Sequence, residues 1–206
     1  MYIPSYYREQ DPRRIQDFME THNFATLVSA VNNKALVSHL PFVVEKQGDQ
    51  LHLLSHLARG NPQWQSFTPD AEVTVIFREP HAYISPMHYE DRLNVPTWNY
   101  VAIHAHGHPA IIEGPEAAAA MSRIIHAVDP GYVQQYQSLP DDYLSGMMKR
   151  LVVFTILVVN LEANFKLSQD HSLADQQNII TALNKEADPY KQEIAQMMAE
   201  NLKSLK

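Results

Sequence analysis

Short turns between β-forming segments constrain this chain more than any other feature. Asn32-Asn33 separates Phe24–Val31 from Ala35–Val44, and Gly48 lies between that second segment and Leu51–Ser55. Asn and Gly tolerate the positive φ of tight turns, and such short connections join antiparallel neighbours. Because more β-forming segments follow, the sequence favours a small antiparallel barrel over a doubly wound parallel sheet.

Alternating hydrophobicity and helix-capping residues locate the remaining elements. Further strands are predicted at Glu72–Phe77, Ala82–Ser85, Trp98–Glu113 and Leu151–Leu161. Helices are predicted at residues 11–22, 59–67, 116–127 and 140–149, with an amphipathic pair at 173–183 and 189–205. The chain is therefore expected to be α+β, an antiparallel barrel with peripheral helices and a C-terminal helical extension.

Composition removes several classes of protein. The 206 residues include no cysteine, which excludes disulfides, thiolate metal sites and cysteine nucleophiles. The formal charge of −7 argues against a broad basic face for nucleic acid. No apolar run approaches the roughly 20 residues of a membrane helix, and the first residues do not follow the signal-peptide pattern. We therefore expect a cytoplasmic protein without membrane contact, for which direct DNA binding is doubtful.

The segment Ser55–Pro62 has the residues of a phosphate site. It is predicted to lie where a strand passes into a helix, a junction that offers free backbone N–H groups. Arg59 adds a planar, permanent cation, and Ser55 and His56 add hydrogen-bond donors. The alternative is a capped helix with a surface arginine, and the spacing alone leaves both interpretations open.

Two other polar segments could meet a ligand. Thr97 and Asn99 can hydrogen-bond a planar heterocycle while Trp98 packs on it, although a tryptophan at a strand start more often serves the core. In Phe165–Gln169, Lys166 and Gln169 alternate with apolar residues and can reach a ligand. The alternative for this segment is an exposed strand edge protected by its lysine.

Three histidines recur at alternate positions of one predicted strand. His104, His106 and His108 would share a face, with neighbours about 6.8 Å apart. Such imidazoles can hold a metal, but a polar, solvent-facing strand face is the more ordinary explanation, and no metal is assigned. The chain also has no nucleophile elbow, Walker loop or glycine-rich dinucleotide motif.

Together these motifs resemble those of the PaiB-like, FMN-binding negative transcriptional regulators. The matching segments are, in order, Met1–Pro4, His39–Phe42, His56–Trp64, Ala82–Pro86, Val95–Tyr100 and Phe165–Gln169. The resemblance runs from residue 1 to about residue 185. It implies an FMN-binding domain over residues 1–185, with residues 186–206 as a helical extension of the same domain.

The resemblance also implies a split β-barrel of the pyridoxamine-phosphate-oxidase type that forms a homodimer with FMN at the subunit interface. Its phosphate would lie near the first polar segment, its ring near the second, and the third would complete the site. The candidate cofactor-binding residues are Ser55, His56, Arg59, Asn61, Thr97, Trp98, Asn99, Lys166, Ser168 and Gln169.

Several positions depart from the family pattern. They are Glu79-Pro80 in place of Gly-Pro, Met87-His88 after Ser85-Pro86, Ala163-Asn164 in place of Gly-Lys, and Asp170 in place of Asn. The loss of a lysine and the gain of an aspartate make the expected pocket less positive.

Three functions follow from the resemblance and the composition. The first is an FMN-binding regulator that acts on transcription indirectly, because the chain is acidic and shows no basic recognition helix. The second is an FMN-dependent oxidoreductase of a small molecule, for which no residue can be assigned as acid or base. The third is a haem-binding split barrel, which the histidines motivate.

Overall fold

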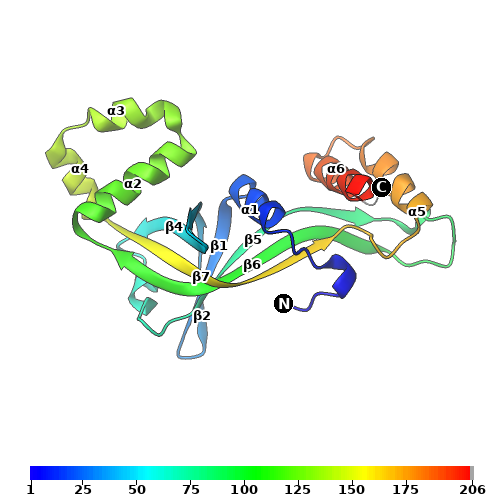
Figure 1. The fold of residues 1–206 in the computed structure, drawn as a ribbon, viewed down its shortest axis with the longest axis horizontal. Coiled ribbons are helices and arrows are strands. Elements are labelled where there is room, and N and C mark those ends of the chain that lie inside the picture. The colour runs from blue at the N-terminus through cyan, green and yellow to red at the C-terminus, as the bar shows by residue number, and fades with distance from the viewer. Residues whose placement is uncertain (205–206) are drawn as a thin grey trace. The chain divides into compact units, whose positions relative to one another are not determined.

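A computed structural model describes residues 1–204 as a seven-stranded sheet with helices (Figure 1). The strands are β1 (Phe24–Val31), β2 (Lys34–Pro41), β3 (Val43–Gln47), β4 (Gln50–Ala58), β5 (Val73–Ile84), β6 (Thr97–Ile112) and β7 (Leu151–Lys166). The helices are α1 (Pro12–Thr21), α2 (Gly114–Val128), α3 (Val133–Gln137), α4 (Asp141–Met148), α5 (Leu173–Leu183) and α6 (Pro189–Ser204). Short 3-10 helices lie at Ser5–Tyr7, Pro62–Ser66, Pro86–His88 and Pro130–Tyr132.

The strands follow the order β2-β1-β5-β6-β7-β4-β3. The β1–β2, β1–β5, β3–β4 and β4–β7 pairs are antiparallel. The turn signals at Asn32-Asn33 and Gly48 predicted the β1–β2 and β3–β4 connections. Asn32 and Asn33 have φ of 50° and 61°, which closes the β1–β2 hairpin with the positive angles that asparagine tolerates. No described helix is long and apolar enough to cross a membrane.

The predicted strand Ala35–Val44 is wrong, because the structure divides it into β2 and β3 on either side of Phe42. Pro41 has no N–H to donate, so it ends β2. The Phe42 side chain is buried, and its ring centroid lies 6.1 Å from that of Phe77 and 6.3 Å from that of Phe154. Burial of this aromatic cluster therefore decides where the chain leaves the β1–β2 hairpin.

Several other predicted elements have different bounds. β4 continues to Ala58 because it pairs with the start of β7, so Ser55 and His56 lie inside a strand. The predicted helix at 59–67 is a 3-10 helix of five residues, Pro62–Ser66. β5 runs without interruption through Glu79-Pro80, and β7 extends to Lys166. The short helix α3 was not predicted.

The chain divides into two compact units. Unit 1 contains Met1–Ile15, Arg78–Ile103 and the chain from Glu162 onward, whereas unit 2 contains Gln16–Phe77 and His104–Leu161. In unit 1, α5 and α6 pack side by side (Figure 1). They bury Ile179, Ile180, Leu183, Ile194, Ala195 and Met198. The prediction that residues 186–206 extend the main domain stays a prediction.

Unit 2 has its own hydrophobic cluster between the sheet and α2. Its buried members are Leu54, Ala117, Ala120, Ile124 and Val153, with Val43, Ile112, Met121 and Met148 packed against them. The chain from α2 through α3 to α4 lies to one side of the strands of this unit (Figure 1).

The structure gives a specific reason for glycine at position 107, in β6. A Cβ atom at this position would lie 2.2 Å from the carbonyl oxygen of Leu157 and 2.8 Å from Ile156 Cγ2. Only a residue without a side chain therefore allows β6 to approach β7 this closely.

Candidate functional site

A cavity of about 800 Å³ in unit 2 is the main candidate site. Its walls come from the end of β6, the start of β7 and the three helices α2, α3 and α4. The α2 wall includes Ala117, Ala118 and Ala119, whose short side chains leave the cavity open. The volume lies within the range of roughly 300–1,000 Å³ that is usual for small-molecule and cofactor pockets.

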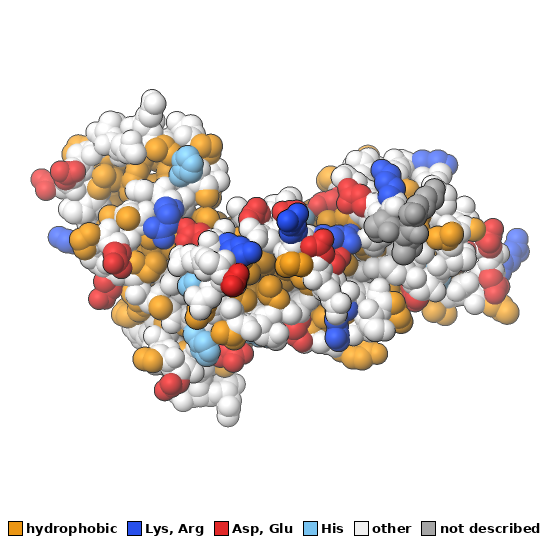
Figure 2. Space-filling view, in the orientation of Figure 1, with side chains coloured by type: hydrophobic (Ala, Val, Ile, Leu, Met, Phe, Trp, Pro, Cys, Tyr) orange, Lys and Arg blue, Asp and Glu red, His pale blue; other side chains and the backbone are white. Residues whose placement is uncertain are grey.

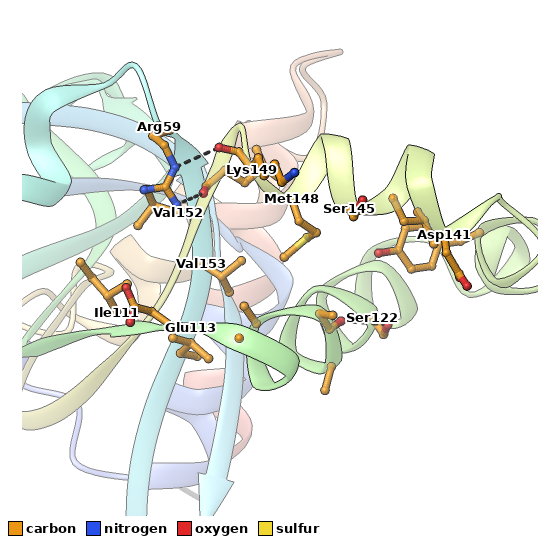
Figure 3. Close-up of a pocket in the computed structure, with 18 of the residues that line it drawn as sticks. Arg59, Ile111, Glu113, Ser122, Asp141, Ser145, Met148, Lys149, Val152 and Val153 are labelled. Atoms are coloured by element: carbon orange, nitrogen blue, oxygen red, sulfur yellow. Dashed lines mark hydrogen bonds between the residues drawn. The ribbon is translucent and has the colours of Figure 1, made fainter.

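Arg59, which was predicted to bind phosphate, lines this cavity (Figure 3). Its Nε donates to the carbonyl of Lys149 over 3.0 Å, and its Nη2 donates to the carbonyl of Leu151 over 2.9 Å. Its Cζ also lies 5.7 Å from the centroid of the Trp64 ring. These contacts fix the guanidinium but do not neutralise it, because both acceptors are uncharged carbonyl groups.

The third nitrogen of Arg59, Nη1, has no hydrogen-bond partner among the described residues, and no described carboxylate forms an ion pair with the guanidinium. Lys149 adds a second cation to the cavity lining, while Asp141 lies away from Arg59 (Figure 3). A permanent cation held in place with an unused donor is suited to a phosphate oxygen.

Ser55 and His56, on β4, differ in their environment. Ser55 is fully buried, and its hydroxyl donates to the carbonyl of Pro41 over 2.7 Å, so it supports the strand pairing. His56 is partly buried, and its Nδ1 has no hydrogen-bond partner. Burial lowers the pKa of His56, because the charged imidazolium would lose hydration. A nearby anion would favour the protonated form and offset this cost.

Asn61 holds the local backbone rather than facing the cavity. Its Oδ1 accepts from the N–H of Gln63 over 3.0 Å, which caps the 3-10 helix, and its Nδ2 donates to Ser38 Oγ over 2.8 Å. Gly60 has open space at its Cβ position, so the protein itself leaves room beside the backbone there. The predicted helix-start anion site loses its basis, since a five-residue 3-10 helix carries little dipole.

The other predicted site residues meet in unit 1, at the starting end of β6 and the last residues of β7. Lys166 Nζ donates to Thr97 Oγ1 and, over 2.7 Å, to the carbonyl of Trp98. Burial lowers the pKa of Lys166, and the negative charge of Asp170 opposes that shift. The Lys166 ammonium group is therefore already engaged by the neighbouring strand.

Asn99, Ser168 and Gln169 also use their polar groups within the protein. Asn99 is fully buried and donates to Ser168 Oγ over 2.9 Å. Gln169 bridges its own turn, because its Nε2 donates to the carbonyl of Phe165 and its Oε1 accepts from the N–H of Leu167. Trp98, in contrast, is 53% exposed. For this set a cofactor contact stays a prediction.

The three strand histidines make polar contacts within unit 2. His106 Nδ1 lies 3.0 Å from Thr74 Oγ1, and His108 Nδ1 lies 3.0 Å from the carbonyl oxygen of Ala71. The rings of His104 and His106 have centroids 6.2 Å apart. These contacts fit the interpretation of a polar strand face, and no metal is assigned to it.

Sequence reasoning missed most of the cavity lining. The residues from α2 and α4, among them Ala117, Ser122, Ser145 and Met148, come from segments interpreted only as helices, and Tyr136 comes from α3, which was not predicted. One usable signal was the run of four alanines at 117–120, which gives one turn of the helix without bulky side chains. The helix walls of the cavity carry polar as well as apolar side chains, and the Arg59 cation lies at one side. The cavity therefore has the groups to hold a ring system that carries a phosphate.

Comparison with known proteins gives consistent matches. The model of a family described as "Putative FMN-binding domain" matches residues 1–160. The "Protease synthase and sporulation protein PAI 2" of Bacillus subtilis is 35% identical over 208 residues, which cover 98% of this chain and 99% of that protein.

Two solved structures are similar in fold. A FAD- and haem-binding protein from Mycobacterium smegmatis superposes with a TM-score of 0.61 at 13% identity, covering 78% of this chain and 73% of that one. A flavocytochrome from Azotobacter vinelandii gives a TM-score of 0.61 at 10% identity, covering 80% and 72%. The predicted split β-barrel is thereby confirmed, with a sheet that does not close.

Proposed function

The chain belongs to the FMN-binding domain family, and we propose that its FMN occupies the cavity of unit 2 with the phosphate at Arg59. The family resemblance inferred from the motifs is confirmed, and with it FMN as the cofactor. The observation that carries the placement is the Arg59 guanidinium, which two carbonyl groups fix and no described carboxylate pairs.

Each part of the cavity has a role in this proposal. Arg59 Nη1 binds a phosphate oxygen, and Lys149, which also lines the cavity, adds a second positive charge. The alanine face of α2 and the side chain of Met148 exclude water from the flat ring. When bound, FMN supplies hydride or single-electron transfer, and the protein supplies the binding and the surroundings.

The test compares FMN with riboflavin, which lacks the phosphate. We expect Arg59→Ala to weaken FMN binding at least tenfold and riboflavin binding much less. Arg123→Ala is the matched control, because Arg123 pairs with Glu45 on the surface of the same unit and does not line the cavity. An equal loss for both ligands would contradict the phosphate role of Arg59.

A second measurement tests the cofactor itself. A ligand that binds only the folded protein must stabilise it, by about 2.7 kcal/mol at a free concentration of 100 times Kd. We expect FMN to raise the melting temperature of the wild-type protein and to raise that of Arg59→Ala less. Absence of any FMN-dependent stabilisation of the wild-type protein would refute FMN binding.

The function proposed for this protein is a regulatory one in which FMN is bound and DNA is affected indirectly. The Bacillus subtilis relative is named for protease synthesis and sporulation. Direct DNA contact is disfavoured by the net charge of −7, and Lys and Arg side chains on the face shown in Figure 2 are interspersed with Asp and Glu. Tight, sequence-specific binding of DNA by the isolated protein in a gel shift at physiological salt would overturn the proposal of an indirect effect. No observation favours the oxidoreductase or haem alternative over it.

The protein is also proposed to be a cytoplasmic homodimer. Met87, Leu93 and Val95, on the segment before β6, are 88%, 91% and 78% exposed, which is costly for a monomer in water. Light scattering should give twice the mass of the chain, and Leu93→Asp should lower it. Val128→Asp, at an exposed valine that ends α2, is the control and should leave the mass unchanged.

A further inference from the structure

A second cavity, in unit 1, has features of a ligand site that the proposed function does not use. Its volume is about 300 Å³, which is at the small end of the range for ligand pockets. Its lining comes from the middle of β5 and the start of β6: Arg78, Glu79, Pro80, His81, Trp98, Tyr100, Val101 and Ala102. A carboxylate, an imidazole and two aromatic rings therefore converge on one small space.

Glu79 and His81 form a carboxylate–imidazole pair. His81 Nδ1 lies 2.9 Å from Glu79 Oε2. An ionised carboxylate can only accept a hydrogen bond, so the proton of this contact lies on Nδ1. In the neutral ring Nε2 is then an acceptor, and it has no hydrogen-bond partner among the described residues. The pair is arranged as a base whose Nε2 can take a proton.

The backbone at Glu79 supports a role for this carboxylate. Its φ is 120°, a value that side-chain-bearing residues rarely adopt. Such a conformation persists where the surroundings hold it, and residues of this kind concentrate at functional sites. Here it places the carboxylate between two cationic or basic groups, since Glu79 Oε1 also lies 3.6 Å from Arg78 Nη2.

Aromatic rings surround the imidazole. The His81 ring centroid is 5.8 Å from that of Trp98 and 5.5 Å from that of Tyr190 on α6. Tyr83 lies 5.8 Å from Trp98 in an edge-on arrangement. Trp98, Tyr83 and Tyr190 are all more than two-fifths exposed, so their faces are available to a flat molecule.

Tyr100 adds a hydrogen-bond donor to the lining. Its hydroxyl oxygen accepts from Asn164 Nδ2 over 3.0 Å, and its own proton has no acceptor among the described residues. The hydroxyl oxygen of a ligand can therefore accept a hydrogen bond from Tyr100, while the ligand's own hydroxyl proton faces the His81 imidazole.

We propose that this cavity binds a small planar phenol, with its ring on Trp98, its hydroxyl toward His81 Nε2, and Glu79–His81 as a proton-accepting pair. The step balances as a proton transfer. The phenolic O–H bond breaks, an N–H bond forms at Nε2, and the imidazolium is compensated by Glu79 on one side and the phenolate on the other. The site is independent of FMN and can be tested in its absence.

The probe for the test is 4-nitrophenol, because its phenolate absorbs visible light and its neutral form does not. The protein without FMN is titrated at a fixed pH at which the free probe is mostly neutral, and tryptophan fluorescence and visible absorbance are followed together. We expect saturable quenching accompanied by a rise in the phenolate band. Wild-type protein that shows no saturable binding refutes the proposal.

Variants separate ring binding from proton transfer. Trp98→Ala should weaken binding at least tenfold. His81→Gln should still bind but without the phenolate band, and Glu79→Gln should reduce that band. His126→Gln, an exposed histidine on α2, is the matched control and should behave as the wild type. A phenolate band that persists in His81→Gln would overturn the role of His81. Displacement of 4-nitrophenol by FMN would overturn the claim that the two ligands occupy separate sites.

Discussion

The hydroxyl of Tyr7 donates a hydrogen bond to Asp170 Oδ1 over 2.8 Å and so joins two residues that are 163 positions apart. Tyr7 is 6% exposed. A hydrogen bond to a charged acceptor contributes about 1.5–3 kcal/mol. We expect Tyr7→Phe to lower the free energy of unfolding by about that amount in urea denaturation. Tyr6→Phe is the control. The Tyr6 side chain is exposed, so this substitution should change the free energy of unfolding little.

The same pair predicts loss of stability in alkali. Burial raises the pKa of Tyr7, and the hydrogen bond to Asp170 and its charge raise that pKa further. The stabilisation is complete below the unfolded pKa of about 10 and decreases as the pH rises above it, because the unfolded chain releases the proton first. Wild-type stability should therefore fall above pH 10 more steeply than that of Tyr7→Phe. Parallel curves for the two proteins would contradict the assignment.

The burial of His56 predicts that the stability of the fold depends on pH in the acid range. Its folded-state pKa lies below the ordinary value because the ring is buried, so the unfolded chain binds more protons below about pH 6.5. Stability should decrease as the pH falls through this range, and less so in His56→Gln. Urea unfolding of the wild type and of His56→Gln at pH 5 and pH 7.5 measures this dependence.

Local signals predicted the hairpins, whereas partners distant in sequence decided the strand lengths. The Asn32-Asn33 turn depends on residues that accept positive φ, and β1 has the predicted bounds. β4 extends past Ser55 because residues as far as Ala58 pair with β7, whose start lies more than 90 positions later. Phe42 interrupts a sequence that reads as one strand because its ring is buried beside Phe77 and Phe154.

The candidate site was predictable only where one segment carried the chemistry. Arg59 was found because a lone arginine followed a strand and preceded Gly60-Asn61-Pro62. Its orientation depends on the carbonyls of Lys149 and Leu151, which no local pattern shows. Asn99 and Ser168, whose cofactor contact stays a prediction, hydrogen-bond each other in the buried interior. Sequence spacing cannot distinguish a polar residue that binds a ligand from one that is hydrogen-bonded within the core, because both roles use the same types of side chain.

A side chain at position 107 is expected to disturb the packing of β6 against β7. In Gly107→Ala the new Cβ would meet the backbone carbonyl of Leu157, which cannot move without disturbing the β6–β7 pairing. Such overpacking costs about 1–3 kcal/mol. Gly146→Ala is the matched control, because that helical position has open space and alanine favours a helix by about 0.5–1 kcal/mol. Thermal melts should shift in opposite directions, and a neutral Gly107→Ala would contradict the close approach.

Arg59→Lys separates the charge of this side chain from its shape. Lysine keeps a cation beside the cavity but cannot donate to two carbonyl groups from one planar group and still offer a third nitrogen. If the phosphate needs only a charge, Arg59→Lys should bind FMN as the wild type does. If the fixed guanidinium matters, as the two carbonyl contacts indicate, FMN affinity should fall to a value between those of wild type and Arg59→Ala. Raising the salt concentration should then weaken FMN binding to the lysine variant more than to the wild type, because a flexible, hydrated ammonium is screened more readily than a held guanidinium. Equal salt dependence in titrations of the two proteins would indicate that the carbonyl contacts do not position Arg59 for the ligand.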